Sequence, residues 1–284
     1  MRLLLVAQEP PLDPGKVVTG NALRAAQLTS SLAAAGHEVI HVSLSKAPRR
    51  QARQFRNRDD LRSLVLNEQP DVILVCFWHL LDLLPFDSDI PVVLDFVAPR
   101  PLEEIYQAPD EAADSLRRLR LELAKVDLVL VGNAQQSSLL LLPLIEAGHD
   151  LRQSIPIAVV PLAAEPVQAQ RADPGQSGWT IVTGGVSWPW RRATAWLDAL
   201  QQRAGEAWRL VVFGGDYALH PESKIQQAEG LLQRPLEPYQ QYSAFLAQQS
   251  HIGLELSDDN VERRFSQSFR SLDFLRHGLP LICN

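Results

Sequence analysis

Apolar positions along the chain fall into short continuous runs, which alternate with longer segments in which apolar residues recur with a helical period. The first run covers residues 2–7 and is typical of a strand buried on both faces of a parallel sheet. A helix is expected over about residues 21–35, where Gly36 suits its C-cap, and a second strand over 37–44. Together these elements predict a right-handed βαβ unit at the start of the chain.

The same alternation continues through the first half of the chain. The expected strands lie at residues 71–77, 91–96, 127–131 and 157–161, and the expected helices at 58–68 and 102–125, with a further helix capped by Asn133. Strands that alternate with helices in this way predict an α/β domain built on a parallel sheet.

A second alternation begins after residues 162–178, a small and polar segment with proline and glycine that is the best linker candidate. Strands are expected at 179–183, 208–213, 252–256 and 279–283, and helices near 194–203, 238–249 and 268–277. The pattern of the second half therefore repeats the α/β pattern of the first half at a shorter length.

The chain of 284 residues is long enough for two domains. The expected limits are 1–162 for an N-terminal Rossmann-like domain, 163–178 for a linker and 179–284 for a C-terminal Rossmann-like domain. The chain ends at Asn284, directly after an apolar strand that would leave one face uncovered. We therefore expect the second domain to be incomplete.

Composition and charge exclude several classes of protein. A hydrophobic fraction of 46% and a charged fraction of 21% are those of a folded globular chain. The net charge of −6 argues against a general nucleic-acid surface, because a phosphate backbone requires positive faces. We expect no nucleic-acid partner. Cys76 and Cys283 lie in apolar runs and are expected to be buried thiols, which fits a cytoplasmic protein.

The chain carries no sequence signal for export or for a membrane span. The first apolar run is too short for a signal peptide, and no segment has roughly 18 uninterrupted apolar residues. Peripheral contact with the inner face of the membrane stays an open alternative. The sequence does not address the oligomeric state.

Motifs for several cofactor and metal chemistries are missing from the sequence. There is no paired-cysteine cluster of the kind that holds zinc. No GxGxxG motif follows the first strand, which weakens a dehydrogenase interpretation, and no GxSxG elbow is present. We therefore expect neither a metal nor a resident cofactor.

The segment from Glu262 to Leu281 resembles the donor-site segment of family-4-like glycosyltransferases (glycosyl transferases group 1). In that family an acidic residue precedes a helix that holds a second acidic residue, and Gly-Leu-Pro follows. Asp273, five residues before Gly278, resembles the second acid. The usual position of the first acid is Phe265 here, so Glu262 stands in for it, as in a subgroup with a similar spacing.

Other segments carry the same resemblance with lower specificity. They are the loop with Gly20 before the first helix, the strand 70–75, residues 160–162 before the linker, and residues 184–191 at the start of the second domain. The family's phosphate-binding Arg and Lys lie in the last of these. Arg191 falls on the Lys position, whereas Val186 falls on the Arg position, so that one phosphate cation is either missing or supplied by Arg192 or Arg270.

The resemblance implies a GT-B fold, in which two Rossmann-like, doubly wound α/β domains face a cleft. It also implies roles for individual residues. The catalytic candidates are Glu262 at the donor sugar, Arg191 at the departing diphosphate and His79 in the cleft. The candidates for binding are Gly184, Gly185, Trp188, Trp190, Arg192, Arg270 and Asp273 on the donor side, and Gly20 and Asp95 near the acceptor.

Each of these residues also has a purely structural interpretation. Asp273 lies three residues from both Arg270 and Arg276, as an acid on a helix surface would. Glu262 could be one charge of a solvated loop, and Asp95 could order its own loop. Trp188 and Trp190 could fill a seam between domains, His79 could be partly buried beside Trp78, and Arg191 could be a solvated cation at a helix start.

The function implied by the resemblance is transfer of a sugar from a nucleoside diphosphate sugar, with UDP and GDP not distinguished, to an acceptor hydroxyl. It implies retention at the anomeric carbon without a metal or an assigned general base. Polysaccharide, lipid-linked and small glycoside acceptors stay open. A degenerate, non-catalytic nucleotide- or sugar-binding module is one alternative, since Val186 and Phe265 depart from the pattern. A GT-B-fold nucleotide-sugar epimerase is the other.

Overall fold

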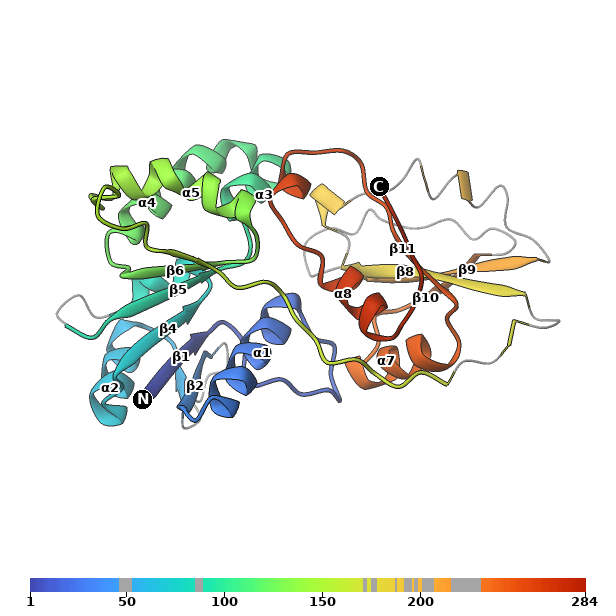
Figure 1. Ribbon diagram of the computed structural model, residues 1–284, viewed down its shortest axis with the longest axis horizontal. Helices are drawn as coiled ribbons and strands as arrows, with labels where there is room; N and C mark the ends of the chain where they lie inside the picture. The colour runs from blue at the N-terminus through green and yellow to red at the C-terminus, as the bar shows by residue number, and fades with distance from the viewer. Residues whose placement is uncertain are drawn as a thin grey trace. The chain divides into compact units, whose positions relative to one another are not determined.

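The computed structural model describes residues 1–45, 53–84, 89–170, 173–174, 178–186, 188–191, 196, 199–200, 207–215 and 231–284. The chain forms two compact units (Figure 1). The first comprises Met1–Leu12, Thr19–Leu162 and Val261–Gln267, and the second Asp13–Val18, Ala163–Asn260 and Ser268–Asn284. Each unit is built on one parallel sheet, which confirms the α/β class expected from the sequence.

The first unit contains a seven-stranded sheet with the order β3-β2-β1-β4-β5-β6-β7 (Figure 1). Its strands are β1 (Arg2–Ala7), β2 (Glu38–Leu44), β3 (Gln54–Phe55), β4 (Val72–Cys76), β5 (Val92–Phe96), β6 (Leu128–Val131) and β7 (Ile157–Val159). All neighbouring strands pair in parallel. Parallel strands need crossover connections, which the helices between them supply.

Helices and short 3₁₀ turns connect these strands. They are α1 (Gly20–Ala34), α2 (Arg58–Glu68), η1 (Trp78–Leu83), α3 (Arg100–Gln107), η2 (Pro109–Glu111), α4 (Ala112–Leu123) and α5 (Ala134–Glu146). The Asn133 side chain accepts a hydrogen bond from the Gln136 backbone N–H, so that the expected cap of α5 is confirmed.

Two details of the helices differ from the expectation. The single helix expected over 102–125 is divided into α3 and α4, because Pro109 cannot donate a backbone hydrogen bond and forces Ala108 out of the helical region. The N-cap of α1 is Thr19, so that the helix begins at Gly20 rather than at residue 21. The Thr19 hydroxyl accepts from the Ala22 backbone N–H and donates to Glu9.

Side chains from alternate strand positions form separate cores on the two faces of the first sheet. On one face, the strand residues pack against α2, α4 and α5, through members such as Leu4, Val6, Ile73, Leu61 and Leu144. On the other face, Leu5, Ala7, Leu74 and Cys76 pack against Ala25 and Leu28 of α1. Because both faces are covered, every position of β4, and every position of β1 after Arg2, is apolar, which explains the continuous apolar runs in the sequence.

The second unit contains a five-stranded sheet with the order β10-β9-β8-β11-β12. Its strands are β8 (Trp179–Val186), β9 (Trp208–Gly215), β10 (Leu231–Arg234), β11 (Ile252–Glu255) and β12 (Leu281–Cys283), joined by η4 (Pro189–Arg191), α7 (Tyr239–Gln248) and α8 (Phe269–Arg276). The strand β10 was not expected from the sequence. The helix expected near 194–203 lies largely outside the described residues.

Phenylalanine side chains dominate the core of the second unit. Phe213, Phe245 and Phe274 are buried with Val182 and Val211. A Cβ atom at Gly253 would lie 2.5 Å from the Phe274 ring, so that the strand can pass α8 at this point only as glycine. Cys76 is buried as expected, but Cys283 is exposed, because β12 is the edge strand of its sheet.

The two units are not two continuous stretches of chain, in contrast to the expected limits. Val261–Gln267 belongs to the first unit, although the sequence analysis assigned it to the C-terminal domain. Asp13–Val18 belongs to the second unit, where the carbonyl oxygens of Pro14 and Lys16 accept hydrogen bonds from the Gln240 and Tyr239 backbone N–H groups. These two N–H groups lie in the first turn of α7, which has no partner for them within the helix.

Within the described ranges, no helix is long and apolar enough to cross a membrane.

Candidate functional site

The first unit carries two of the expected site residues at the carboxyl ends of its strands. The strand order reverses between β1 and β4, which are paired neighbours. In open α/β sheets, ligands bind outside the carboxyl ends of the strands at such a reversal. Gly20 is the first residue of α1, which follows β1, and His79 lies in η1, which follows β4. Both residues therefore lie at the end of the sheet where this architecture binds ligands.

His79 is a partly buried imidazole next to a strained residue. Phe77 has a φ of 129°, which residues with a side chain rarely adopt. Its ring meets the His79 ring edge to face, with the two centroids 4.4 Å apart. The pKa of His79 is lowered from 6.5 to about 4, mainly by burial and also by the charge of Arg100, while the charge of Asp82 opposes the shift. His79 is therefore neutral at neutral pH and able to hydrogen-bond a hydroxyl group.

We expect the His79 ring to stay neutral between pH 8 and pH 5 and to take up its proton only near pH 4. The unfolded chain then holds one more proton than the folded chain between pH 6.5 and 4, so that His79 makes folding less favourable as the pH falls through this window. NMR titration of the histidine rings checks this, with the His79→Asn protein to assign the signal and the urea-unfolded chain as the control. A folded-state midpoint at 6.5 would contradict it.

Asp95, expected near the acceptor, is held by a buried arginine. Arg24 of α1 donates from Nε to both carboxylate oxygens, at 3.2 and 3.1 Å, and from Nη2 to Oδ1 at 2.9 Å. Both side chains are almost fully buried. Burial raises the pKa of Asp95, and the hydrogen bond and charge of Arg24 oppose that increase. Arg24 therefore makes three of the roughly four hydrogen bonds that an ionised carboxylate can accept.

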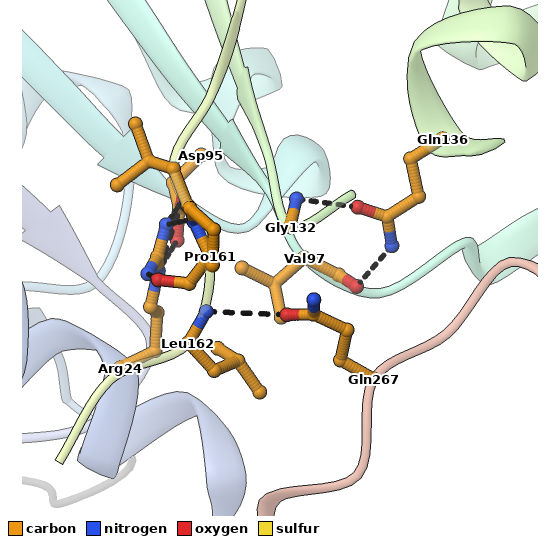
Figure 2. Close-up of polar contacts among 9 residues, drawn as sticks. Arg24, Asp95, Val97, Gly132, Gln136, Pro161, Leu162 and Gln267 are labelled. Atoms are coloured by element: carbon orange, nitrogen blue, oxygen red, sulfur yellow. Dashed lines mark hydrogen bonds and ion pairs between the residues drawn. The ribbon is translucent and has the colours of Figure 1, made fainter. Parts of the chain in front are cut away.

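Arg24 also binds the chain where it leaves the sheet after β7. Its Nη2 donates to the Val160 carbonyl at 2.9 Å and its Nη1 to the Pro161 carbonyl at 3.1 Å (Figure 2). One guanidinium group thus joins α1, the end of β5 and the segment after β7. A planar group with five N–H donors suits such a site, which a lysine could not fill.

Glutamine side chains bind the neighbouring strand ends. Gln136 accepts from the Gly132 backbone N–H at 2.7 Å and donates to the Val97 carbonyl at 2.8 Å (Figure 2). Gln267 accepts from the Leu162 backbone N–H at 3.1 Å. A Cβ atom at Gly132 would lie 2.8 Å from the Gln267 side-chain oxygen, so that glycine permits the close approach. These contacts place residues 132, 162 and 267 together in the first unit.

Glu262, the expected first acid, lies in the first unit and is fully buried. It begins the 3₁₀ turn η5 (Glu262–Arg264). The preceding Val261 N–H donates to the Tyr106 hydroxyl at 3.1 Å, and the Phe265 carbonyl accepts from Asn133 Nδ2 at 3.3 Å. The interpretation of Glu262 as one charge of a solvated loop is therefore wrong.

In the second unit, the carboxyl end of β8 consists of two glycines with left-handed backbone angles. Gly184 has a φ of 140° and Gly185 a φ of 116°. A Cβ atom at Gly184 would lie 2.1 Å from the Phe213 carbonyl oxygen of β9. A Cβ atom at Gly185 would lie 2.9 Å from the Arg270 guanidinium. Both positions therefore require glycine, and the second brings the backbone close to a cation.

Arg270 and Asp273 on α8 have partners other than each other. Arg270 Nη1 lies 3.4 Å from Glu255 Oε2, at the end of β11. Asp273 Oδ1 accepts from the Tyr239 hydroxyl at 2.6 Å and lies 3.9 Å from Arg276 Nη1. The structural interpretation of Asp273 placed it in ion pairs with both Arg270 and Arg276. Among the described side chains, Asp273 pairs with Arg276, whereas Arg270 pairs with Glu255.

The environment of Asp273 is buried and polar. Burial raises the pKa of Asp273, while the Tyr239 hydrogen bond and the charge of Arg276 oppose that increase. Burial also raises the pKa of the Tyr242 hydroxyl, with Asp273 adding to the increase and Arg270 opposing it. Asp273, Arg270, Tyr239 and Tyr242 therefore form one cluster of interacting polar groups. The cluster lies beside the carboxyl ends of β8 and β11.

The expected aromatic pair is stacked. The rings of Trp188 and Trp190 are 5.0 Å apart and inclined by 13°. Trp190 is buried, and its carbonyl oxygen accepts from Asn260 Nδ2 at 2.7 Å. Arg191 closes the same turn, with its backbone N–H donating to the Trp188 carbonyl. Arg192 lies outside the described residues.

The residues of these networks that the sequence analysis missed include Arg24, Tyr239, Glu255 and Gln267. Arg24 carried a signal, because it shares the buried face of α1 with Ala22, Ala25 and Leu28. A charged side chain on an apolar helix face needs a buried partner. The other three carried no signal in the linear sequence, since their partners come from distant segments.

The described residues contain no group of three or more His, Cys, Asp or Glu side chains that could hold a metal ion.

No family model matches the chain, and no curated protein sequence matches it. Solved structures do match. The sucrose-phosphate synthase of Thermosynechococcus elongatus superposes with a TM-score of 0.67 at 12% identity, over 99% of this chain and 80% of that one. HepE of Anabaena, in complex with UDP-glucose, gives a TM-score of 0.59 at 13% identity, over 100% of this chain and 80% of that one.

A third similar structure is an alpha-glucosyltransferase in complex with UDP, with a TM-score of 0.59 at 14% identity, over 100% of this chain and 80% of that one. Another structure of an alpha-glucosyltransferase contains UDP and a 13-mer DNA. At these identities the likeness establishes the fold. The chain has the GT-B fold, with two Rossmann-like α/β units, as the sequence led us to expect.

Proposed function

We propose that this protein is a glycosyltransferase that moves a sugar from a nucleoside diphosphate sugar to an acceptor hydroxyl. The observation that carries the proposal is the cluster at the carboxyl edge of the second sheet, where Gly185, next to Gly184 in β8, approaches the Arg270 guanidinium. A diphosphate leaving group gains negative charge as the glycosidic bond breaks, and an arginine beside a glycine backbone suits that charge. The fold shared with three glycosyltransferase structures supports the same activity.

The remaining residues of the second unit suit the rest of a nucleotide. Asp273 is the acid that would hydrogen-bond the ribose hydroxyls, and Tyr239 and Arg276 hold its Oδ1 in place. The stacked Trp188 and Trp190 would supply an aromatic surface for the base. Arg191, in the same turn, is the second cation proposed for the diphosphate. We propose UDP as the nucleotide, because the HepE and alpha-glucosyltransferase structures contain it.

Finer aspects of the reaction rest on the family resemblance. We propose that the anomeric configuration is retained, that no metal or resident cofactor takes part, and that Glu262 and His79 act near the sugar. The acceptor is proposed to be a carbohydrate or a lipid-linked sugar. DNA is a further acceptor to test, because an alpha-glucosyltransferase of the same fold was solved with DNA, whereas the net charge of −6 disfavours it here.

Calorimetric titration of the whole chain with UDP, GDP and ADP tests the proposal. We expect UDP to bind, and UDP-glucose to be consumed when a suitable acceptor is added. If none of the three nucleotides binds, the proposal that the protein is a glycosyltransferase is wrong. Binding without transfer to any acceptor would favour a binding module, and conversion of the donor without any acceptor would favour an epimerase.

Asp273→Asn is expected to weaken UDP binding, because the amide loses the charge-assisted contact with the ribose hydroxyls. The loss should be about 1.5–3 kcal/mol, and Arg191→Ala should cause a loss of similar size at the diphosphate. Titration of UDP into each variant measures it. Asp258→Asn, the same substitution at an exposed acid of the same unit, is the matched control and should bind UDP as the natural chain does. Unchanged affinity in both test variants would mean that the donor site lies elsewhere.

A further inference from the structure

Glu255 is a buried acid at the carboxyl edge of the second sheet, and the donor site described above gives it no role. It is the last residue of β11 and is 2% exposed. β11 pairs with β8 in the register Ile252 to Ile181 and Gly253 to Val182. Continuing this register by two residues places Glu255 level with Gly184. The acid therefore ends its strand beside the glycine pair of β8.

Arg270 connects Glu255 to that glycine pair. Its Nη1 lies 3.4 Å from Glu255 Oε2. Its Nη2 lies 2.9 Å from the position that a Cβ atom would take on Gly185. The guanidinium therefore lies between an acid on one strand and the backbone of the next, and its side chain is 17% exposed. Any side chain at Gly185 would compete with the guanidinium for space.

Two features of this position disfavour an unpaired positive charge on Arg270. It is the second residue of α8, where the helix dipole disfavours a positive charge. A cation that is mostly withdrawn from water also needs a compensating charge. Glu255 provides that charge from the strand side, so that the remaining N–H groups of the planar guanidinium acquire a defined direction.

We propose that Glu255 is a positioning residue, which holds Arg270 against the Gly184–Gly185 strand end and so directs the Arg270 guanidinium to the diphosphate of the donor. This inference rests on the proposed function. It assigns no contact between Glu255 and the donor, because the acid acts through Arg270. A residue with this role affects ligands that carry phosphate and leaves the bare nucleoside unaffected.

Titration of the whole chain with UDP and with uridine tests the proposal. Glu255→Gln is expected to lower the affinity for UDP about tenfold, the size of one weakened charge-assisted hydrogen bond, and to leave the affinity for uridine unchanged. Glu237→Gln is the matched control, since Glu237 pairs with Arg234 at 2.6 Å in the same unit. Its affinities for UDP and uridine should equal those of the natural chain.

The outcomes separate this inference from the proposed function. If the natural chain binds UDP and Glu255→Gln binds it equally well, Glu255 does not position Arg270. If UDP and uridine affinities fall together, Glu255 has a general structural role and the inference is wrong. If thermal unfolding shows that Glu255→Gln is not folded, Glu255→Asp replaces it as the test variant. This variant keeps the charge on a shorter side chain and should still lower the affinity for UDP without changing the affinity for uridine. A natural chain that binds no nucleotide refutes both the function and the inference.

Discussion

Replacement of Gly184 by alanine should destabilise the second unit more than any other single change considered for it. The added Cβ atom would lie 2.1 Å from the Phe213 carbonyl oxygen, a backbone atom of the neighbouring strand that cannot rotate away. The φ of 140° is also strained for any residue with a side chain. Overpacking and backbone strain together should cost about 4 kcal/mol, since each contributes roughly 1–3 kcal/mol. Urea unfolding followed by tryptophan fluorescence measures this loss.

Gly214→Ala provides a matched control for Gly184→Ala. Gly214 lies in β9, directly after Phe213, and a Cβ atom there would meet nothing within 4 Å. We expect the control to change the free energy of unfolding by less than about 1 kcal/mol. Equal losses in the two variants would show that β8 and β9 do not approach as closely as described. A Gly184→Ala protein of unchanged stability would contradict the backbone geometry outright.

The second large effect is expected from Arg24→Met. Methionine fills most of the space of the arginine stem but leaves the Asp95 carboxylate buried without its partner. Removal of one member of a buried ion pair typically costs about 3–5 kcal/mol. Two backbone carbonyls, those of Val160 and Pro161, also lose their donor. Urea unfolding at neutral pH should report this loss as a lower midpoint for the first unit.

The pH dependence of this loss follows from the pKa of Asp95. Burial already raises that pKa above its unfolded value, and removal of Arg24 takes away the group that opposes the increase. An acid whose pKa is raised by folding favours the folded state at low pH, and this contribution disappears as the pH rises from the unfolded toward the folded pKa. Arg24→Met should therefore lose less stability in acid than at neutral pH.

Two further variants control for the loss of a charge as such. The double variant Arg24→Met with Asp95→Asn removes the buried charge and should recover part of the stability. Arg152→Met breaks an exposed ion pair with Asp150 and should leave the stability of the chain unchanged. If Arg24→Met and Arg152→Met have the same stability, the buried pair does not stabilise the first unit.

Most of the fold could be predicted from the pattern of apolar residues. The strands β1 and β4 are buried on both faces of the sheet. Their sequences are therefore continuous apolar runs, which can be recognised without the structure. Errors arose where the signal is weak. β10 was missed because its segment, Leu231–Arg234, is short and half polar. The break between α3 and α4 was missed because the helical pattern continues on both sides of Pro109, although the proline itself signals a break.

The candidate site could be predicted only as separate residues. The Gly184–Gly185 pair, Arg270 and Asp273 were identified from motifs, because special backbone angles and charges on a short helix leave local signals. The residues that contact these side chains left no such local signal in the sequence. Glu255 follows an apolar strand like many other strand ends, and its relation to Arg270 depends on the pairing of β8 with β11.

The sequence by itself determined two parallel α/β sheets and the strand ends at which the expected donor residues lie, because local periodicity reflects burial. Only the tertiary structure decided which side chains meet. Arg24 and Asp95 are 71 positions apart, and neither residue type nor spacing specifies such a pair. The structure also decided that Val261–Gln267, with Glu262, belongs to the first unit rather than to the second. The position of this segment along the chain does not specify the unit to which it belongs. The assignment depends on hydrogen bonds such as that between Gln267 and Leu162, which form only after distant strands have assembled.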